Sequence, residues 1–210
     1  MKARISGLYA VTPDLVDTTL LLEQLRAAIS GGVRLVQYRN KVADENLLRE
    51  QATALRDLCR SCGATLIIND HVELAREIDA DGVHIGAEDA AIAHARSRLG
   101  VRKIIGASCY DELPRAKIAV PQGVDYVAFG SFFPSTIKPG AVRASLALLQ
   151  QARREFMLPI VAIGGITQTN ARELISAGAD AIAVISALFF APDIEVAARE
   201  FGGFFRTKDA

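Results

Sequence analysis

The segment Gln37-Tyr38-Arg39-Asn40-Lys41 places an amide and two cations at the end of a short apolar run. Alternate residues of a strand share a face, so Gln37, Arg39 and Lys41 are expected to point together. One amide and two converging cations can bind a diphosphate or a carboxylate. A solvated loop is the alternative, and the binding interpretation is preferred because the charges directly follow a buried strand.

Two aspartates near these cations could hold a metal ion. Asp70 follows Asn69 at the end of the next apolar run, and Asp89 follows the run after that. Two carboxylates at adjacent strand ends suit Mg²⁺, which takes one or two carboxylates together with waters and phosphate oxygens. Helix capping is the competing interpretation, since both aspartates precede helical patterns. From the residues alone the two interpretations carry equal weight.

Two further segments suit a phosphate ligand. The stretch 130–140 combines hydroxyl side chains, Lys138 and terminal glycines, which is the composition of a loop that closes over a site. The pair Gly164-Gly165 and the run that ends at Ser186 could offer backbone N–H groups to a phosphate. The alternatives are a turn-rich loop and a plain turn that packs a helix.

These residues must be positioned by short apolar runs that alternate with longer amphipathic ones. The runs expected to be strands are Leu8–Val11, Arg34–Tyr38, Thr65–Ile68, Gly82–Ile85, Lys103–Ala107, Tyr126–Phe129, Ile160–Ile163 and Ala181–Ile185. Several lack polar alternation, as is typical of parallel strands covered on both faces. Eight alternating units without a linker predict an α/β fold in which residues 1–210 form a single (β/α)8 TIM barrel.

A doubly wound open sheet is the competing architecture. It would favour G-x-G-x-x-G after the first strand, where this chain reads Val11-Thr12-Pro13-Asp14. In a barrel, the active site lies at the carboxyl ends of the strands. The polar or glycine residues expected there are Thr12, Gln37, Arg39, Asn69, Asp70, His84, Ser108, Gly130, Ser131, Gly164, Gly165 and Ser186. Without a partner in the sequence, His84 is interpreted as a satisfied core or mouth residue.

The composition excludes several classes of protein. The 210 residues carry 24 basic and 24 acidic side chains, and this balance disfavours nucleic acid or an anionic membrane as a partner. No apolar run reaches the roughly 20 residues of a membrane helix, and the start lacks a signal-peptide pattern, so we expect a cytoplasmic protein. The pair Cys59-x-x-Cys62 lacks further zinc ligands, so reduced thiols are expected. The sequence does not give the number of subunits, and it is compatible with a homo-oligomer.

Taken in order, these segments resemble the thiamine phosphate synthase family over nearly the whole chain. The matching pieces are Leu8–Thr12, Gln37-x-Arg39-x-Lys41, Asn69-Asp70, Ala80–Gly86 with Glu88-Asp89, Gly106-x-Ser108, Phe133-Pro134 with Lys138, and Ile163–Ile166. The resemblance implies a TIM-barrel transferase of thiamine biosynthesis with two small-molecule substrates. It would condense 4-amino-2-methyl-5-(diphosphooxymethyl)pyrimidine with a thiazole phosphate, giving thiamine phosphate and diphosphate.

The resemblance also implies a role for each matching residue. In the family, Mg²⁺ and basic residues draw diphosphate from the pyrimidine methylene, and the thiazole nitrogen attacks the carbocation-like centre. Asp70 and Asp89 would ligate Mg²⁺, which then outweighs capping. The residues implied to bind the pyrimidine diphosphate are Gln37, Tyr38, Arg39, Asn40, Lys41, Asn69, Ser108 and Lys138, of which Arg39, Ser108 and Lys138 would be catalytic. Those implied to bind the thiazole phosphate are Ser135, Thr136, Ile137, Gly165, Ile185 and Ser186.

Two positions depart from the family pattern. The loop that usually reads Pro-Thr-x-Thr-Lys has Ile137 in place of the second threonine, so one hydroxyl for the thiazole phosphate is missing. Tyr110 stands where a similar barrel, the thiazole tautomerase, relies on a histidine. A tautomerase-like isomerase is therefore one alternative, which the missing histidine disfavours. A barrel that binds a phosphorylated metabolite without catalysis is the other, suggested by the altered loop.

Overall fold

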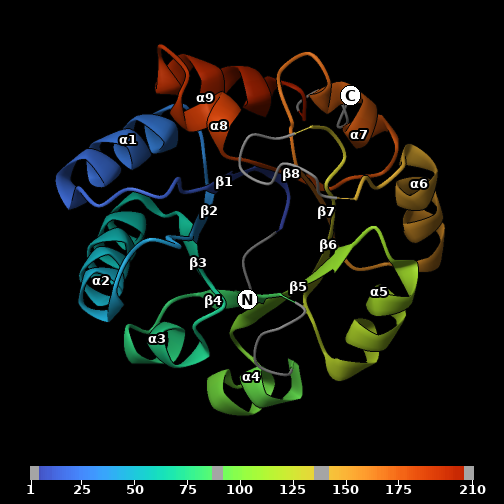
Figure 1. The fold of residues 1–210 in the computed structure, drawn as a ribbon, viewed down its shortest axis with the longest axis horizontal. Helices are drawn as coiled ribbons and strands as arrows, with labels where there is room; N and C mark the ends of the chain where they lie inside the picture. Colours follow the sequence, from blue (N-terminus) through green and yellow to red (C-terminus); the bar gives the residue numbers. More distant parts are fainter. Residues whose placement is uncertain (1–4, 87–91, 135–141, 206–210) are drawn as a thin grey trace.

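Parallel strands close into a barrel in the computed structural model, which describes residues 5–86, 92–134 and 142–205. Each strand pairs with the next along the chain, and the last pairs with the first (Figure 1). The strands are β1 (Gly7–Val11), β2 (Leu35–Tyr38), β3 (Thr65–Asn69), β4 (Gly82–Ile85), β5 (Ile104–Tyr110), β6 (Tyr126–Phe129), β7 (Ile160–Ile163) and β8 (Ala181–Val184). The predicted TIM barrel is confirmed, and the open sheet is excluded.

A ring of helices covers the outside of the barrel (Figure 1). They are α1 (Thr18–Ser30), α2 (Glu45–Cys62), α3 (Val72–Glu77), α4 (Ile92–Leu99), α5 (Leu113–Ala119), a short 3₁₀ helix (Val120–Gln122), α6 (Leu146–Glu155), α7 (Ala171–Ser176), α8 (Ser186–Phe189) and α9 (Ile194–Gly203). Among the described residues, four side chains cap a helix by accepting from the backbone N–H three residues on: Asp17, Asp44, Ser145 and Asp193. Within the described ranges, no helix combines the length and apolarity needed to cross a bilayer.

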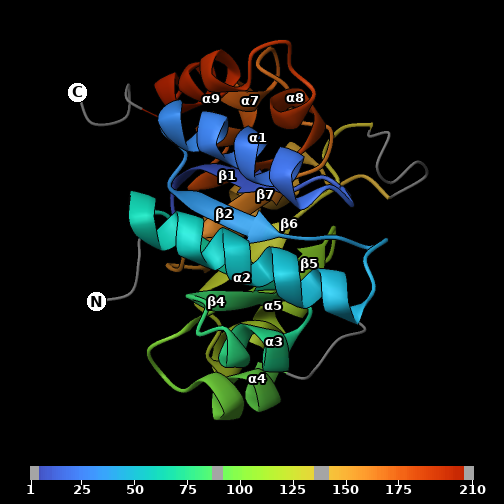
Figure 2. The same ribbon diagram turned by 90° about the vertical axis from the view of Figure 1, so that its left-hand side faces the viewer.

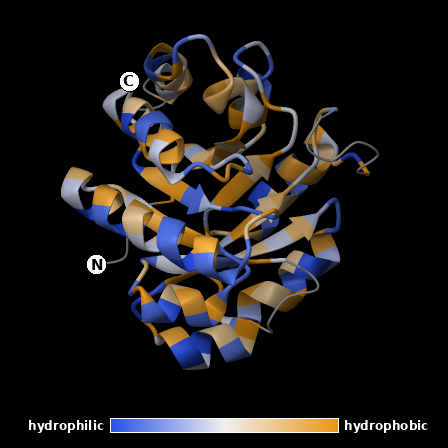
Figure 3. Ribbon diagram, turned by 60° about the vertical axis from the view of Figure 1, so that its left-hand side comes forward, coloured by the Kyte–Doolittle hydropathy of each residue, from blue (hydrophilic) through white to orange (hydrophobic). Residues whose placement is uncertain are grey.

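The strands separate two apolar cores. The larger core lies between the barrel and the helices, and Figure 3 shows the hydrophobic residues concentrated on the strands and on the helix faces that cover them. The smaller core fills the barrel interior and includes Tyr9, Leu35, Ile67, Tyr126 and Ala183. Alternate residues of each strand therefore face opposite cores, which explains the apolar runs without polar alternation.

One strand differs from its predicted bounds in a way that matters for the site. The strand β5 continues to Tyr110, three residues beyond the predicted end at Ala107. Its pairing with β6 shifts register between Ser108 and Tyr110, where Tyr110 adopts a positive φ of 51°. Such bulges re-aim side chains at the end of a strand, and short-range pattern does not reveal them.

Three aspartates stabilise the end of the barrel opposite the strand carboxyl ends. Asp81, Asp125 and Asp180 precede β4, β6 and β8, and each accepts the backbone N–H of a residue on the preceding strand at 2.8 Å. The partners are Leu66, Ile105 and Ile160, so the arrangement repeats at β4, β6 and β8. Arg96 also pairs with Asp125 at 2.7 Å. These carboxylates tie neighbouring strands together where they begin.

We expect Asp125→Asn to lower the free energy of unfolding by about 1–3 kcal/mol, because it weakens a charge-assisted hydrogen bond and a shielded ion pair. Urea titration at neutral pH measures the change. Asp57→Asn is the matched control, since the Asp57 side chain is 66% exposed and pairs with its neighbour Arg56. Equal losses in the two variants would contradict the role given to Asp125.

Candidate active site

The carboxyl ends of the strands gather the polar residues predicted from the sequence. Figure 2 shows the barrel from the side, with the loops that follow the strands at one end. Two loop residues after β1 organise the segment after β2 there. The Thr12 hydroxyl accepts the Arg39 backbone N–H and donates to the Arg39 carbonyl, both at 2.9 Å. The Asp14 carboxylate pairs with the Arg39 guanidinium at 3.0 Å and accepts the Lys41 backbone N–H at 2.8 Å.

The remaining residues of this segment face other layers. The Tyr38 hydroxyl donates to Gln51 Oε1 of α2 at 2.8 Å, and Asn40 Nδ2 donates to the same oxygen at 3.0 Å. Both side chains are buried and held against α2. Gln37 extends into the barrel interior, where its Nε2 donates to the Tyr9 hydroxyl at 3.0 Å. The structure therefore brings Arg39 and Lys41 to the mouth and places Gln37 deeper.

Asp70 lies beside these cations. Its φ is 65°, and its carboxylate pairs with Lys41 and accepts a hydrogen bond from Asn69 Nδ2 at 2.6 Å. The N-cap of α3 is His71, so the interpretation of Asp70 as the N-cap of this helix is wrong. Only 14% of the Asp70 side chain is exposed, and its oxygens are ligands that Mg²⁺ prefers. Asp70 thus fits a magnesium site next to a cation.

Ser108 receives a partner that the sequence did not reveal. His84 lies across from it on β4, and its Nε2 is 2.8 Å from Ser108 Oγ. Its Nδ1 is 2.9 Å from the Tyr126 hydroxyl. Burial lowers the pKa of His84 to about 4, although the nearby charge of Asp70 acts in the opposite direction. The imidazole is therefore neutral near pH 7, a satisfied residue as expected, and it contacts a predicted catalytic hydroxyl.

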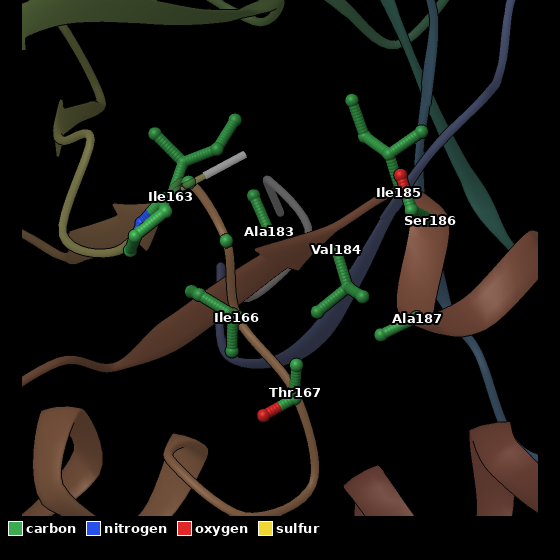
Figure 4. A pocket seen from close by; sticks show the side chains of 11 residues that line it. Ile163, Ile166, Thr167, Ala183, Val184, Ile185, Ser186 and Ala187 are labelled. Atoms are coloured by element: carbon green, nitrogen blue, oxygen red, sulfur yellow. The ribbon is translucent and has the colours of Figure 1, made fainter. Parts of the chain in front are cut away.

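A pocket of about 190 Å³ lies where β7 and β8 end. Figure 4 shows Ile163 on one side and Ile185 with Ser186 on the other. Gly165, Ile185 and Ser186, three of the residues implied to bind the thiazole phosphate, line this pocket together. Gly165 has a φ of 65°, and a Cβ there would overlap the Pro134 carbonyl oxygen. Only glycine therefore fits this wall without displacing the neighbouring chain.

Several predicted residues lie outside the described part of the chain. They are Asp89, Ser135, Thr136, Ile137 and Lys138. Three other residues of the site were not predicted from the sequence: Tyr9, Asp14 and Tyr126. Asp14 follows the first strand two residues after Thr12, which was expected at the mouth, and this position was the available signal. Tyr9 and Tyr126 lie within apolar runs and carried no signal of their own.

Comparison with known proteins agrees with this geometry. The family model described as thiamine monophosphate synthase matches residues 8–188. The chain belongs to this family. It is 55% identical over 205 residues to the thiamine-phosphate synthase of Nitrosospira multiformis, covering 98% of this chain and 88% of that protein. It is 56% identical over 197 residues to that of Methylobacillus flagellatus, covering 94% of each.

A solved structure places the family on the same fold. The thiamine phosphate pyrophosphorylase from Pyrococcus furiosus superposes with a TM-score of 0.85 at 37% identity, covering 96% of each chain. The resemblance inferred from ordered motifs is thereby confirmed. These matches do not favour the tautomerase-like isomerase or the barrel without catalysis.

We expect Gly165→Ala to weaken binding of a thiazole phosphate at least about tenfold, because a left-handed backbone costs an L-residue about 1–2 kcal/mol before any overlap. Calorimetric titration of the ligand measures the effect. Gly202→Ala in α9 is the control, since a Cβ at Gly202 has no neighbour within 4 Å. Unchanged affinity in the Gly165 variant would remove this glycine from the ligand site.

Proposed function

We propose that this chain is a Mg²⁺-dependent thiamine-phosphate synthase of the cytoplasm. It joins 4-amino-2-methyl-5-(diphosphooxymethyl)pyrimidine to a thiazole phosphate and releases diphosphate. The observation that carries the proposal is the meeting of Arg39, Lys41, Asp70 and Ser108 at one barrel mouth in a chain of this family. The two substrates supply the remaining reacting groups.

The cations of the mouth favour departure of the diphosphate. The bond between the pyrimidine methylene carbon and the diphosphate oxygen breaks, and the departing group takes the electron pair and gains negative charge. Arg39 and Lys41 are already held near this position by Asp14 and Asp70, so little reorganisation is needed when the charge develops. Ser108 donates a hydrogen bond to the same group. Lys138, outside the described residues, is assigned the leaving oxygen by the family motif.

The second half of the reaction forms a bond between carbon and nitrogen. The methylene carbon becomes cation-like as diphosphate leaves, and the thiazole nitrogen attacks it with its lone pair. No general base is required, because the attacking nitrogen carries no proton. The neutral, buried His84 fits this scheme, since its ring is engaged by Tyr126 and Ser108 and is not placed to remove a proton.

The pocket between β7 and β8 suits the second substrate. Ile163 and Ile185 supply apolar walls on opposite sides (Figure 4), and Gly164 and Gly165 line the same pocket. Gly165, Ile185 and Ser186 would hold the thiazole phosphate with Ser135, Thr136 and Ile137. In this proposal the thiazole binds at the same mouth as the cations after β2.

The metal site would combine Asp70 with Asp89. When bound, Mg²⁺ supplies Lewis-acid stabilisation of the diphosphate oxygens. Asp70 is suited to this role because its carboxylate oxygens, which are ligands that Mg²⁺ prefers, lie at the mouth.

Purified protein supplied with both substrates should form thiamine phosphate only when Mg²⁺ is present, and excess EDTA should abolish product formation. We expect Asp70→Asn combined with Asp89→Asn to lower kcat/KM at physiological Mg²⁺ by roughly 100-fold or more, as expected when several kcal/mol of charge stabilisation are lost. Chromatography of products measures both effects.

Asp57→Asn serves again as the control, because its exposed carboxylate lies on the outer helix α2. Full activity of the double variant would overturn the metal assignment. Conversion of a thiazole carboxylate phosphate without any pyrimidine substrate would instead support the isomerase.

A further inference from the structure

A continuous chain of hydrogen bonds crosses the barrel interior and ends at Ser108. Gln37 Nε2 of β2 lies 3.0 Å from the Tyr9 hydroxyl of β1, which lies 2.9 Å from the Tyr126 hydroxyl of β6. The Tyr126 oxygen lies 2.9 Å from His84 Nδ1 of β4. His84 Nε2 lies 2.8 Å from Ser108 Oγ of β5. We call these five side chains the interior relay.

The rings of the interior relay are packed firmly. Tyr126 stacks on His84 with ring centroids 5.5 Å apart and an angle of 20° between the planes. Tyr9 meets Tyr126 edge to face at 6.1 Å and 76°. A Cβ at Gly106 would overlap the Tyr126 ring, so the ring position depends on a glycine in β5. Because all three rings are buried, the hydroxyls have few alternative partners.

The donor and the acceptor of each hydrogen bond in the interior relay can be assigned in order, starting at Gln37. Gln37 Nε2 only donates, so the Tyr9 oxygen accepts there. Among the described residues, the buried Tyr9 hydroxyl contacts one further polar group, the Tyr126 hydroxyl, so we assign the Tyr9 hydrogen to this bond. The Tyr126 hydrogen is then donated to His84 Nδ1. A neutral imidazole whose Nδ1 accepts carries its hydrogen on Nε2, which donates to Ser108 Oγ. The Ser108 hydroxyl hydrogen is left for a ligand at the mouth.

We propose that the interior relay fixes the Nε2–H tautomer of His84 and thereby directs the Ser108 hydroxyl hydrogen at the leaving diphosphate. Tyr9, Tyr126 and His84 are then positioning residues, and Ser108 is the residue that touches the substrate. In the opposite tautomer, Ser108 would donate to His84 Nε2 and its hydrogen would be lost to the substrate. The inference rests on the proposed function only where it places the diphosphate at Ser108.

The tautomer is tested directly by ¹⁵N NMR of histidine-labelled protein at neutral pH. In the unaltered chain, the His84 Nδ1 resonance should be that of an unprotonated nitrogen and the Nε2 resonance that of a protonated one. In Tyr126→Phe the Nδ1 atom loses its donor, so both resonances should move toward the values of mixed tautomers. A protonated Nδ1 in the unaltered chain, or unchanged resonances in the variant, would overturn the proposal.

Turnover tests whether the tautomer acts through Ser108. Tyr126→Phe should lower the single-turnover rate roughly 10- to 100-fold with little change in KM, because it weakens one hydrogen bond to a group that gains charge in the transition state. In a Ser108→Ala background, the same substitution should have almost no further effect. Equal losses in both backgrounds would show that Tyr126 acts by another route.

Two further variants test the order of the relay and provide a control for substitutions outside it. Tyr9→Phe keeps the ring and removes a more distant hydroxyl, so its loss of turnover should be smaller than that of Tyr126→Phe; an equal or larger loss would contradict the order of the relay. Asp57→Asn, on the outer helix α2, should leave turnover unchanged. Full activity of Ser108→Ala would refute the contact between Ser108 and diphosphate, while the NMR resonances would still decide the tautomer.

Discussion

A polar side chain inside a closed barrel needs a hydrogen-bond partner, and the strand backbone around it is already used in the ladder. This constraint governs the mouth of the present barrel. Tyr9, Tyr126 and His84 carry polar atoms into an otherwise apolar interior core and satisfy one another there. An unpaired group at this depth would cost about 1–3 kcal/mol, so the five members hold their places together. Ser108, at the mouth end of the interior relay, is thereby anchored by side chains that are buried in the barrel interior.

Charge at the mouth obeys a related rule. Arg39 pairs with Asp14, and Lys41 pairs with Asp70, so each cation is already opposed by a carboxylate. In the proposed reaction, a diphosphate would meet cations whose positions are already set, so little reorganisation would be needed as charge develops. The Arg39 side chain is only 16% exposed, and its pairing is less screened by solvent than a surface salt bridge would be. The proposed reaction would therefore use the same ion pairs for binding and for catalysis.

The fold was predictable because a short apolar run in the sequence marks each strand. Runs such as Tyr126–Phe129 and Ile160–Ile163 need no knowledge of distant residues, and their predicted bounds match the structure. The site was predictable only in part. Tyr9 and Tyr126 are 117 residues apart, so their hydrogen bond leaves no trace in any sequence window. The sequence around Asp70 suits a helix cap, and the positive φ that turns its carboxylate to Lys41 is a tertiary effect. The bulge at Ser108 is of the same kind.

The aspartates that precede alternate strands sit far from the reacting groups. Asp81, Asp125 and Asp180 join strand to strand at the amino end of the barrel, while every reactive side chain described above lies toward the carboxyl end. The contacts that stabilise the barrel and the side chains proposed to react thus lie at opposite ends of the same strands. The loops at the carboxyl ends of the strands can therefore change during evolution or engineering, because the aspartate contacts that stabilise the barrel lie at its other end.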